Sequence, residues 1–277
     1  MTAARGALPA GACDTHVHIY DARVPAEPGG PPLPGAFSVE DYRRVQAALG
    51  LERVVLVQPN AYQFNNAVML GALQALGTAA RAVAVVPADV TDDALERMTR
   101  AGVRAQRFYA LRWGALGLEA LDTLMPRLHA FGWHANIQLD GRTLPEVEER
   151  LLRLPGHFVL DHVGKFLPPP DTGHPAFQSL LRLLGTGRCW VKLSAPYESS
   201  ACLAGPQALQ DVAVLVRALA AQAPERLLWA SNWPHPFPPA GFVPDEEALM
   251  AFFRHCVPDE QVRRRILVDN PAQLYGF

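Results

Sequence analysis

Eight short apolar runs, separated by longer stretches with helical spacing, constrain the fold of this 277-residue chain more than any other feature. Most of the runs are rich in valine, leucine or aromatic residues, and they are continuously apolar instead of alternating with polar residues. Such runs indicate strands that are buried on both faces, as in parallel sheets covered by helices. The runs span 11–17, 53–58, 81–86, 103–108, 133–139, 157–161, 188–194 and 226–231.

The stretches between the runs carry signals for helix starts and ends. Ser38 stands three residues before Asp41, close to a capping box, and Gly50 supplies a natural end. Eight strands alternating with helices predict a single (β/α)8 TIM barrel over residues 1–277, with a doubly wound open sheet as the alternative. The helical patterns cover 38–50, 91–102, 118–132, 143–156, 174–187 and 205–224, and the tail from about 245 predicts two helices with Pro258 between them.

Composition narrows the classes of partner and the compartment. The net charge is −2, so the chain has no basic excess of the kind that binds nucleic acid. No apolar run reaches the roughly 18 residues of a membrane helix, and the first 14 residues lack the apolar core of a secretion signal. The four cysteines are widely spaced and predict reduced thiols without a zinc knuckle. We therefore expect a cytoplasmic protein that binds neither nucleic acid nor membranes and that can form a homo-oligomer.

Polar residues gather where the predicted strands end, which is the face that carries the active site of a TIM barrel. The Pro/Gly-rich segment 24–36 follows the first strand and is a candidate lid or wall of this site. The candidate site residues at the strand ends are Asp14, His16, His18, Asn60, Arg107, Gln138, His162, Lys165, Tyr197, Asn232 and His235.

The stretch "DTHVH" places two histidines two residues apart on one strand. His16 and His18 should therefore point to the same face, where they can bind a metal or hold a carbonyl group. The alternative is a pair of histidines whose hydrogen bonds are satisfied by backbone. His162 is either part of the same site or a cap on the following loop. Arg107 is either a surface ion-pair partner or a binding group for a substrate carboxylate, which its planar guanidinium matches.

Five motifs together resemble the amidohydrolase superfamily, and within it the branch of TIM-barrel enzymes that process lactones. They are "DTHVH", "GVRAQRF", "DHVGK", "VKLSAPYESS" and "APERLLWASNWPH", and they are spread over most of the chain. The resemblance implies that His16, His18, His162 and Asn232 are catalytic. It also implies a substrate-binding role for a second set of residues, which comprises Asp14, Asn60, Arg107, Gln138, Lys165, Tyr197 and His235.

The chain departs from the superfamily pattern at two metal-ligand positions. His16, His18 and His162 match superfamily ligands, but Gln138 replaces a histidine and Asn232 replaces an aspartate. A neutral amide is a poorer ligand for a divalent cation, so we expect no required metal, although the three histidines could still bind zinc. A further departure is Glu198. The pyrone-dicarboxylate enzymes that the chain resembles have a substrate-binding arginine near this position of the sequence.

The resemblance implies an anionic, carboxylated lactone as substrate, and three functions remain open. In a hydrolytic lactonase, His162 or, less favourably, Asp14 would replace the missing aspartate as general base. In an isomerase, a hydroxyl of the substrate attacks its own lactone carbonyl, with Asn232 orienting that hydroxyl. The third possibility is a barrel that binds an acidic small molecule without catalysis.

Overall fold

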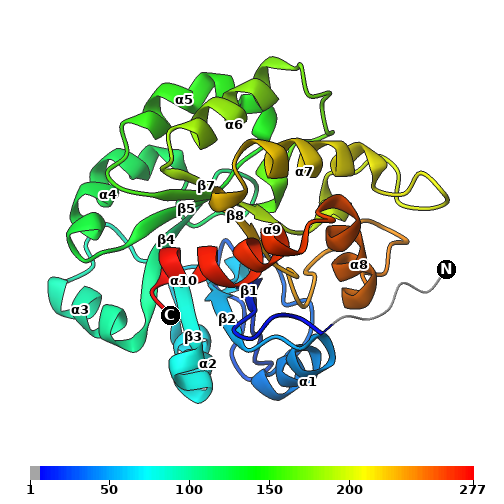
Figure 1. The fold of residues 1–277 in the computed structure, drawn as a ribbon. Helices are drawn as coiled ribbons and strands as arrows, with labels where there is room; N and C mark the ends of the chain where they lie inside the picture. The colour runs from blue at the N-terminus through cyan, green and yellow to red at the C-terminus, as the bar shows by residue number, and fades with distance from the viewer. Residues whose placement is uncertain (1–6) are drawn as a thin grey trace.

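Eight parallel strands in sequential order form the centre of the molecule, and helices surround them (Figure 1). The computed structural model describes residues 7–277, so the first six residues of the predicted domain and of the N-terminal segment lie outside the described part. Eight strands alternating with helices confirm the predicted TIM barrel, and the strand positions agree with the predicted runs to within a few residues. The strands are β1 (Cys13–Val17), β2 (Arg53–Val57), β3 (Ala80–Ala84), β4 (Val103–Tyr109), β5 (His134–Gln138), β6 (Phe158–Leu160), β7 (Cys189–Leu193) and β8 (Leu227–Trp229).

The helices begin and end where the sequence supplies the expected caps. The Ser38 hydroxyl accepts a hydrogen bond from the Asp41 amide, and Asp41 accepts one from the Ser38 amide, which completes the predicted capping box. Glu260–Tyr275 is one continuous helical segment that contains a π-turn at Arg265–Asp269. The helices are α1 (Val39–Leu49), α2 (Ala67–Leu76), α3 (Asp92–Ala101), α4 (Leu121–Ala130), α5 (Leu144–Leu152), α6 (Pro175–Gly185), α7 (Gln210–Gln222), α8 (Glu246–Cys256), α9 (Glu260–Arg264) and α10 (Asn270–Tyr275).

Helix α2 is the barrel helix that the sequence pattern did not reveal. It is apolar on most of its surface, and its N-cap residue, Asn66, makes no side-chain capping bond. The Asn66 side chain instead bonds the backbone of Val85, tying the helix start to the end of β3. A helix without a polar face or a local cap gives little amphipathic signal, so its position depends on tertiary packing.

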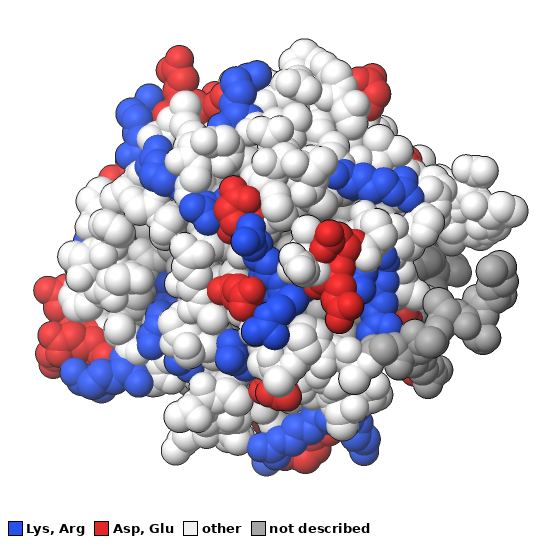
Figure 2. All heavy atoms as spheres, in the orientation of Figure 1, with Lys and Arg blue, Asp and Glu red and all other residues white. Residues whose placement is uncertain are grey.

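The barrel interior below the site is filled by apolar side chains from several strands. Tyr275 of α10 closes this end of the barrel, which faces the viewer in Figure 1. On the same face, acidic and basic side chains are interspersed (Figure 2). The buried side chains that pack together here are Cys13, Val55, Val57, Val83, Ala105, Val159, Trp190, Leu228 and Tyr275.

An irregularity in β1 decides which of its residues face the interior. The register between β1 and β2 shifts between Asp14 and Val17. Cys13 packs inside the barrel, whereas Asp14 bonds Tyr42 of α1 on the outside. A bulge changes the side-chain alternation beyond it, so His16 and His18 return to the interior.

None of the helices within residues 7–277 is long and apolar enough to cross a membrane. The four cysteines, Cys13, Cys189, Cys202 and Cys256, are all free thiols.

Candidate active site

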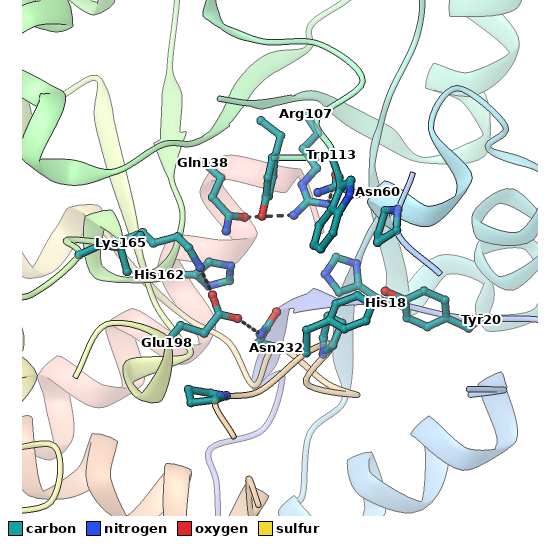
Figure 3. Close-up of a pocket in the computed structure, with 16 residues that line it drawn as sticks. His18, Tyr20, Asn60, Arg107, Trp113, Gln138, His162, Lys165, Glu198 and Asn232 are labelled. Atoms are coloured by element: carbon teal, nitrogen blue, oxygen red, sulfur yellow. Dashed lines mark hydrogen bonds and ion pairs between the residues drawn. The ribbon is translucent and has the colours of Figure 1, made fainter. Parts of the chain in front are cut away.

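A cavity of about 310 Å³ lies at the C-terminal ends of the strands, where the predicted TIM barrel is expected to carry its site (Figure 3). Lys165, Glu198 and Asn232 lie together on one side, and Arg107 and Asn60 lie across the cavity from them. The lining comprises His18, Tyr20, Pro31, Asn60, Arg107, Tyr109, Trp113, Gln138, His162, Lys165, Leu167, Glu198, Asn232, Pro236, Phe237 and Pro239.

Arg107 lies on the interior face of β4, two residues after Ala105 of the apolar layer. Its guanidinium donates to the carbonyl of Gln58 at 2.8 Å and to the side-chain oxygens of Asn60 and Gln138 at 3.2 and 3.1 Å. All three acceptors are neutral, so they fix the orientation of the guanidinium without neutralising its charge. Its Nε is buried and makes no hydrogen bond. The arrangement presents an oriented positive charge to an anionic group of a ligand.

Asn232 follows β8 in a left-handed backbone conformation, with φ of 66°, which asparagine adopts more readily than most residues. Its amide donates to Glu198 Oε1 and to the Tyr197 hydroxyl, both at 3.0 Å. The other carboxylate oxygen of Glu198 forms an ion pair with Lys165. The site therefore contains a carboxylate, next to Asn232, that is contributed by the loop after β7.

Two predicted binding residues, Tyr197 and His235, lie behind Asn232 and do not line the cavity. The Tyr197 hydroxyl contacts His235 Nδ1 at 2.9 Å, and His235 Nε2 contacts Glu246 at 3.1 Å. Because the carboxylate can only accept, Nε2 donates to it, and Nδ1 accepts from Tyr197. Burial raises the pKa of Tyr197 well above its usual value, so its hydroxyl stays protonated. These residues hold Asn232 in place from below.

His162 lines the cavity from the turn after β6. Its Nδ1 contacts the Ser194 hydroxyl at 2.8 Å, which leaves Nε2 for a bound molecule. Burial lowers the pKa of His162 well below its usual value, so the ring is neutral at neutral pH. The backbone here is left-handed at His162 and also at the β-branched Val163, with φ of 55° and 56°. Such strain persists where packing enforces it and is common at functional sites.

His18 lines the cavity, whereas His16 lies beneath it and is completely buried. Their Nε2 atoms are 3.2 Å apart, and His18 Nδ1 contacts the Val57 carbonyl at 2.7 Å. His16 Nδ1 contacts the Lys192 ammonium at 3.2 Å. Burial lowers the pKa of His16 to about 4 and that of His18 well below its usual value, so both rings are neutral. His16 thus acts on the cavity through His18.

A buried polar layer therefore separates the cavity from the apolar barrel interior. Besides His16 it contains Asn136, Asp161 and Lys192, whose side chains contact one another. Neither Asp161 nor Lys192 is among the site residues predicted from the sequence. Counting in twos along β7 from Trp190 places Lys192 in the interior, which is the signal that could have identified it.

Asp14 does not reach the cavity, because it lies on the outer side of the β1 bulge. It is completely buried and accepts hydrogen bonds from the Ser231 amide and hydroxyl and from the Tyr42 hydroxyl. Burial raises its pKa to about 6, although these hydrogen bonds oppose the shift. Asp14 thus joins β1 to β8 and α1, and it lies away from the cavity in which it was expected to bind substrate or serve as a base.

The structure thus brings seven of the eleven predicted residues to the cavity wall and leaves four behind it. Glu198 joins this wall, together with the apolar Trp113 and Phe237, whose rings contact each other above the site. The predicted residues on the wall are His18, Asn60, Arg107, Gln138, His162, Lys165 and Asn232, and those behind it are Asp14, His16, Tyr197 and His235.

The residues do not fit the divalent metal that the superfamily fold implies. Ligand atoms of His16, Asp161 and His162 lie within 4.8 Å of one another, the one such group found among the described residues. However, the Lys192 ammonium lies 3.2 Å both from Asp161 Oδ1 and from His16 Nδ1. The Lys192 ammonium therefore already contacts two of the three ligand residues, Asp161 and His16, and its positive charge would repel a metal ion.

Comparisons with known proteins agree with this architecture. A protein from Agrobacterium fabrum named D-galactarolactone isomerase is 40% identical over 277 residues, which cover 99% of this chain and 94% of that one. A 2-pyrone-4,6-dicarboxylate hydrolase from Comamonas testosteroni is 31% identical, over 97% of this chain and 91% of its own. An apo crystal structure of an Agrobacterium tumefaciens protein matches with a TM-score of 0.92 and 38% identity, covering 98% of this chain and 95% of that one. The model of the Amidohydrolase family matches residues 13–277, and the chain therefore belongs to this family.

Proposed function

We propose that this protein processes a sugar-acid lactone that carries one carboxylate. The observation that carries the proposal is the charge of the cavity wall, where Arg107 and Lys165 face a single carboxylate, Glu198. One positive charge is left over, which matches a singly charged anion better than a dicarboxylate. The 40% identical relative is named for a lactone of this kind, galactarolactone.

The reaction that we propose is isomerisation of the lactone ring. A free hydroxyl of the substrate attacks the lactone carbonyl carbon and gives up its proton. The tetrahedral intermediate then breaks its original bond to the ring oxygen, and that oxygen takes up a proton. No water is consumed, and the product is a lactone of the same composition with a different ring. Holding the two reacting groups in one cavity favours this intramolecular step.

The side chains on the cavity wall can take the necessary roles. Glu198 accepts the proton of the attacking hydroxyl, while the Asn232 amide fixes the carboxylate at 3.0 Å. Lys165, paired with the same carboxylate, lies where it can assist proton return to the leaving oxygen. Arg107 binds the substrate carboxylate, and His162 Nε2 contacts the reacting ester. A positioned base of this kind contributes roughly 10²–10⁴-fold to the rate.

Hydrolysis is the second candidate, because relatives at 30–31% identity are named as hydrolases of pyrone-dicarboxylate and sulfomuconolactone. The same carboxylate, or His162, would then activate a water molecule instead of a substrate hydroxyl. We propose that neither reaction requires a bound metal. We also propose that the protein acts in the cytoplasm, that it has no nucleic-acid partner, and that it can form a homo-oligomer.

The test is an assay of purified protein on a panel of lactones with one or two carboxylates. Proton release at neutral pH measures hydrolysis, and the ¹³C NMR spectrum measures isomerisation. We expect a new lactone spectrum without proton release, and a higher kcat/KM for lactones with one carboxylate. A preference for dicarboxylates would contradict the charge argument. Absence of both signals across the panel would leave ligand binding without catalysis.

A further inference from the structure

The Lys192 side chain ends in the centre of the barrel, surrounded by acceptors. Its Nζ lies 2.7 Å from Asn136 Oδ1, 3.2 Å from His16 Nδ1 and 3.2 Å from Asp161 Oδ1. Lys192 and Asp161 are buried and have no exposed side-chain surface. An ammonium can donate to the Asn136 and His16 acceptors, and the adjacent Asp161 carboxylate balances its charge as an ion-pair partner. The surroundings therefore match a protonated lysine.

The contacts on either side of His16 and His18 fix the position of each ring proton. The Val57 carbonyl can only accept, so His18 carries its proton on Nδ1 and its Nε2 has the lone pair. His16 must then donate from Nε2 to His18, and its Nδ1 accepts from Lys192. The hydrogen bonds run in one direction, from Lys192 through His16 and His18 to Val57.

Asp161 does not compete for the proton of His16. Its Oδ1 lies 3.3 Å from His16 Nδ1 but accepts no well-aligned hydrogen bond, while its Oδ2 accepts from Asn136 at 2.8 Å. The alternative tautomer of His16, protonated on Nδ1, would direct two Nε2 lone pairs at each other across 3.2 Å. Two nitrogen lone pairs that face each other at this distance repel unless a cation lies between them.

We propose that the Lys192 ammonium takes the place of a divalent cation in this barrel, and that it holds His16 and His18 in tautomers that cannot bind a metal together. It supplies the positive charge that balances Asp161, and it occupies the Nδ1 lone pair of His16. Lys192 is thus a positioning residue for His18 at the cavity floor. This assignment does not depend on whether the reaction is isomerisation or hydrolysis.

The direct experiment replaces the lysine with a neutral side chain of similar length, Lys192→Met. This change leaves Asp161 unbalanced and frees both histidines to present Nε2 lone pairs. We expect the variant to bind about one zinc ion per chain at least about tenfold more tightly than the original protein, because a like charge is gone. Isothermal titration and elemental analysis after dialysis measure the binding, and zinc should raise the Tm of this variant alone.

Two control variants test whether the gain in zinc affinity comes from the loss of Lys192 and requires His16. Lys165→Met removes the only other lysine of the chain, which pairs with Glu198 on the cavity wall, and should gain no zinc affinity. The double variant Lys192→Met/His16→Gln should lose the gain. Equal zinc affinity in Lys192→Met and the original protein would overturn the proposal.

A second measurement on the unaltered protein covers the case in which Lys192→Met does not fold. Long-range ¹H–¹⁵N NMR distinguishes the two tautomers of each histidine ring, with His16→Gln and His18→Gln spectra for assignment. We expect His16 protonated on Nε2 and His18 on Nδ1. Finding both rings protonated on Nδ1, with two free Nε2 atoms, would refute the assigned role of Lys192.

Discussion

At the scale of single residues, the site depends on one carboxylate, Glu198, and on the groups that fix its two oxygens. Lys165 pairs with one oxygen, and Asn232 donates to the other at 3.0 Å. The buried contact between Asn232 and the Tyr197 hydroxyl then fixes the amide itself. A carboxylate held in this way can take up a proton without a change of position, which is what a general base requires.

Replacement of this carboxylate by an amide of the same shape tests its role. We expect Glu198→Gln to lower kcat roughly 10²–10⁴-fold, because a neutral amide cannot accept the proton. KM and Tm should change much less, since Gln can still contact Asn232. Glu96→Gln, which alters an exposed carboxylate on α3, is the matched control and should retain most activity. A kcat within twofold of the original for Glu198→Gln would exclude Glu198 as the base.

The buried histidines also predict how stability depends on pH. Burial lowers the pKa of His16 from 6.5 to about 4, and lowers the pKa of His18 and His162 as well. Between pH 6.5 and 4 the unfolded chain binds protons that the folded chain does not, so stability falls as pH falls. Asp14 has the opposite effect, because its raised pKa of about 6 favours protonation of the folded state.

We expect the histidines to outweigh Asp14. His16 alone corresponds to a loss of about 2 kcal/mol in the free energy of unfolding between pH 7 and pH 5. Urea denaturation at the two pH values, with the same ionic strength, measures the difference. A free energy that is unchanged or higher at pH 5 would show that these rings are not held neutral by burial.

At the scale of elements, the segment 24–36 forms part of the cavity wall through Pro31. It is fastened to the loop after β2, because the Glu27 amide donates to the Ala61 carbonyl at 2.8 Å and its carboxylate accepts from Asn65. Gly30 lies so close to this loop that a Cβ atom there would be 2.6 Å from the Asn60 carbonyl. Asn60 in turn contacts Arg107, so the loop position affects the orientation of the guanidinium.

Gly30→Ala should therefore weaken substrate binding without unfolding the barrel. We expect KM to rise roughly three- to tenfold, because the added methyl group displaces Asn60 from Arg107. Gly71→Ala in α2 is the matched control, since a Cβ there meets no atom within 4 Å. Steady-state kinetics and Tm of both variants provide the comparison. Equal KM values for the two variants would show that the contact does not position Arg107.

Among the strands and helices, some could be predicted from the sequence and others could not. Continuous apolar runs identified all eight strands, because a strand buried on both faces has no polar alternation to obscure it. Helix α2 was missed because it lacks both a polar face and a side-chain cap. The bulge in β1 has no local sequence signal, so Asp14 was assigned to the face of His16 and His18 although it lies opposite them.

At the scale of the whole molecule, the barrel is divided into three levels along its axis. Tyr275 and the apolar interior close one end, the buried layer around Lys192 and Asp161 follows, and the cavity opens above it. Seven predicted site residues reach the cavity because strand ends of a barrel converge by topology alone. The direction of each hydrogen bond, and the residues that lie behind Asn232, could be identified only from the three-dimensional structure.

The most direct test of the central claim, that the protein isomerises a lactone without consuming water, is turnover of D-galactarolactone in H₂¹⁸O. Mass spectrometry and ¹³C NMR then follow the product, with an enzyme-free sample as the control for spontaneous opening. The proposed reaction predicts a new lactone of unchanged mass that contains no ¹⁸O. A ring-opened acid that contains one ¹⁸O atom per turnover would contradict it and establish hydrolysis.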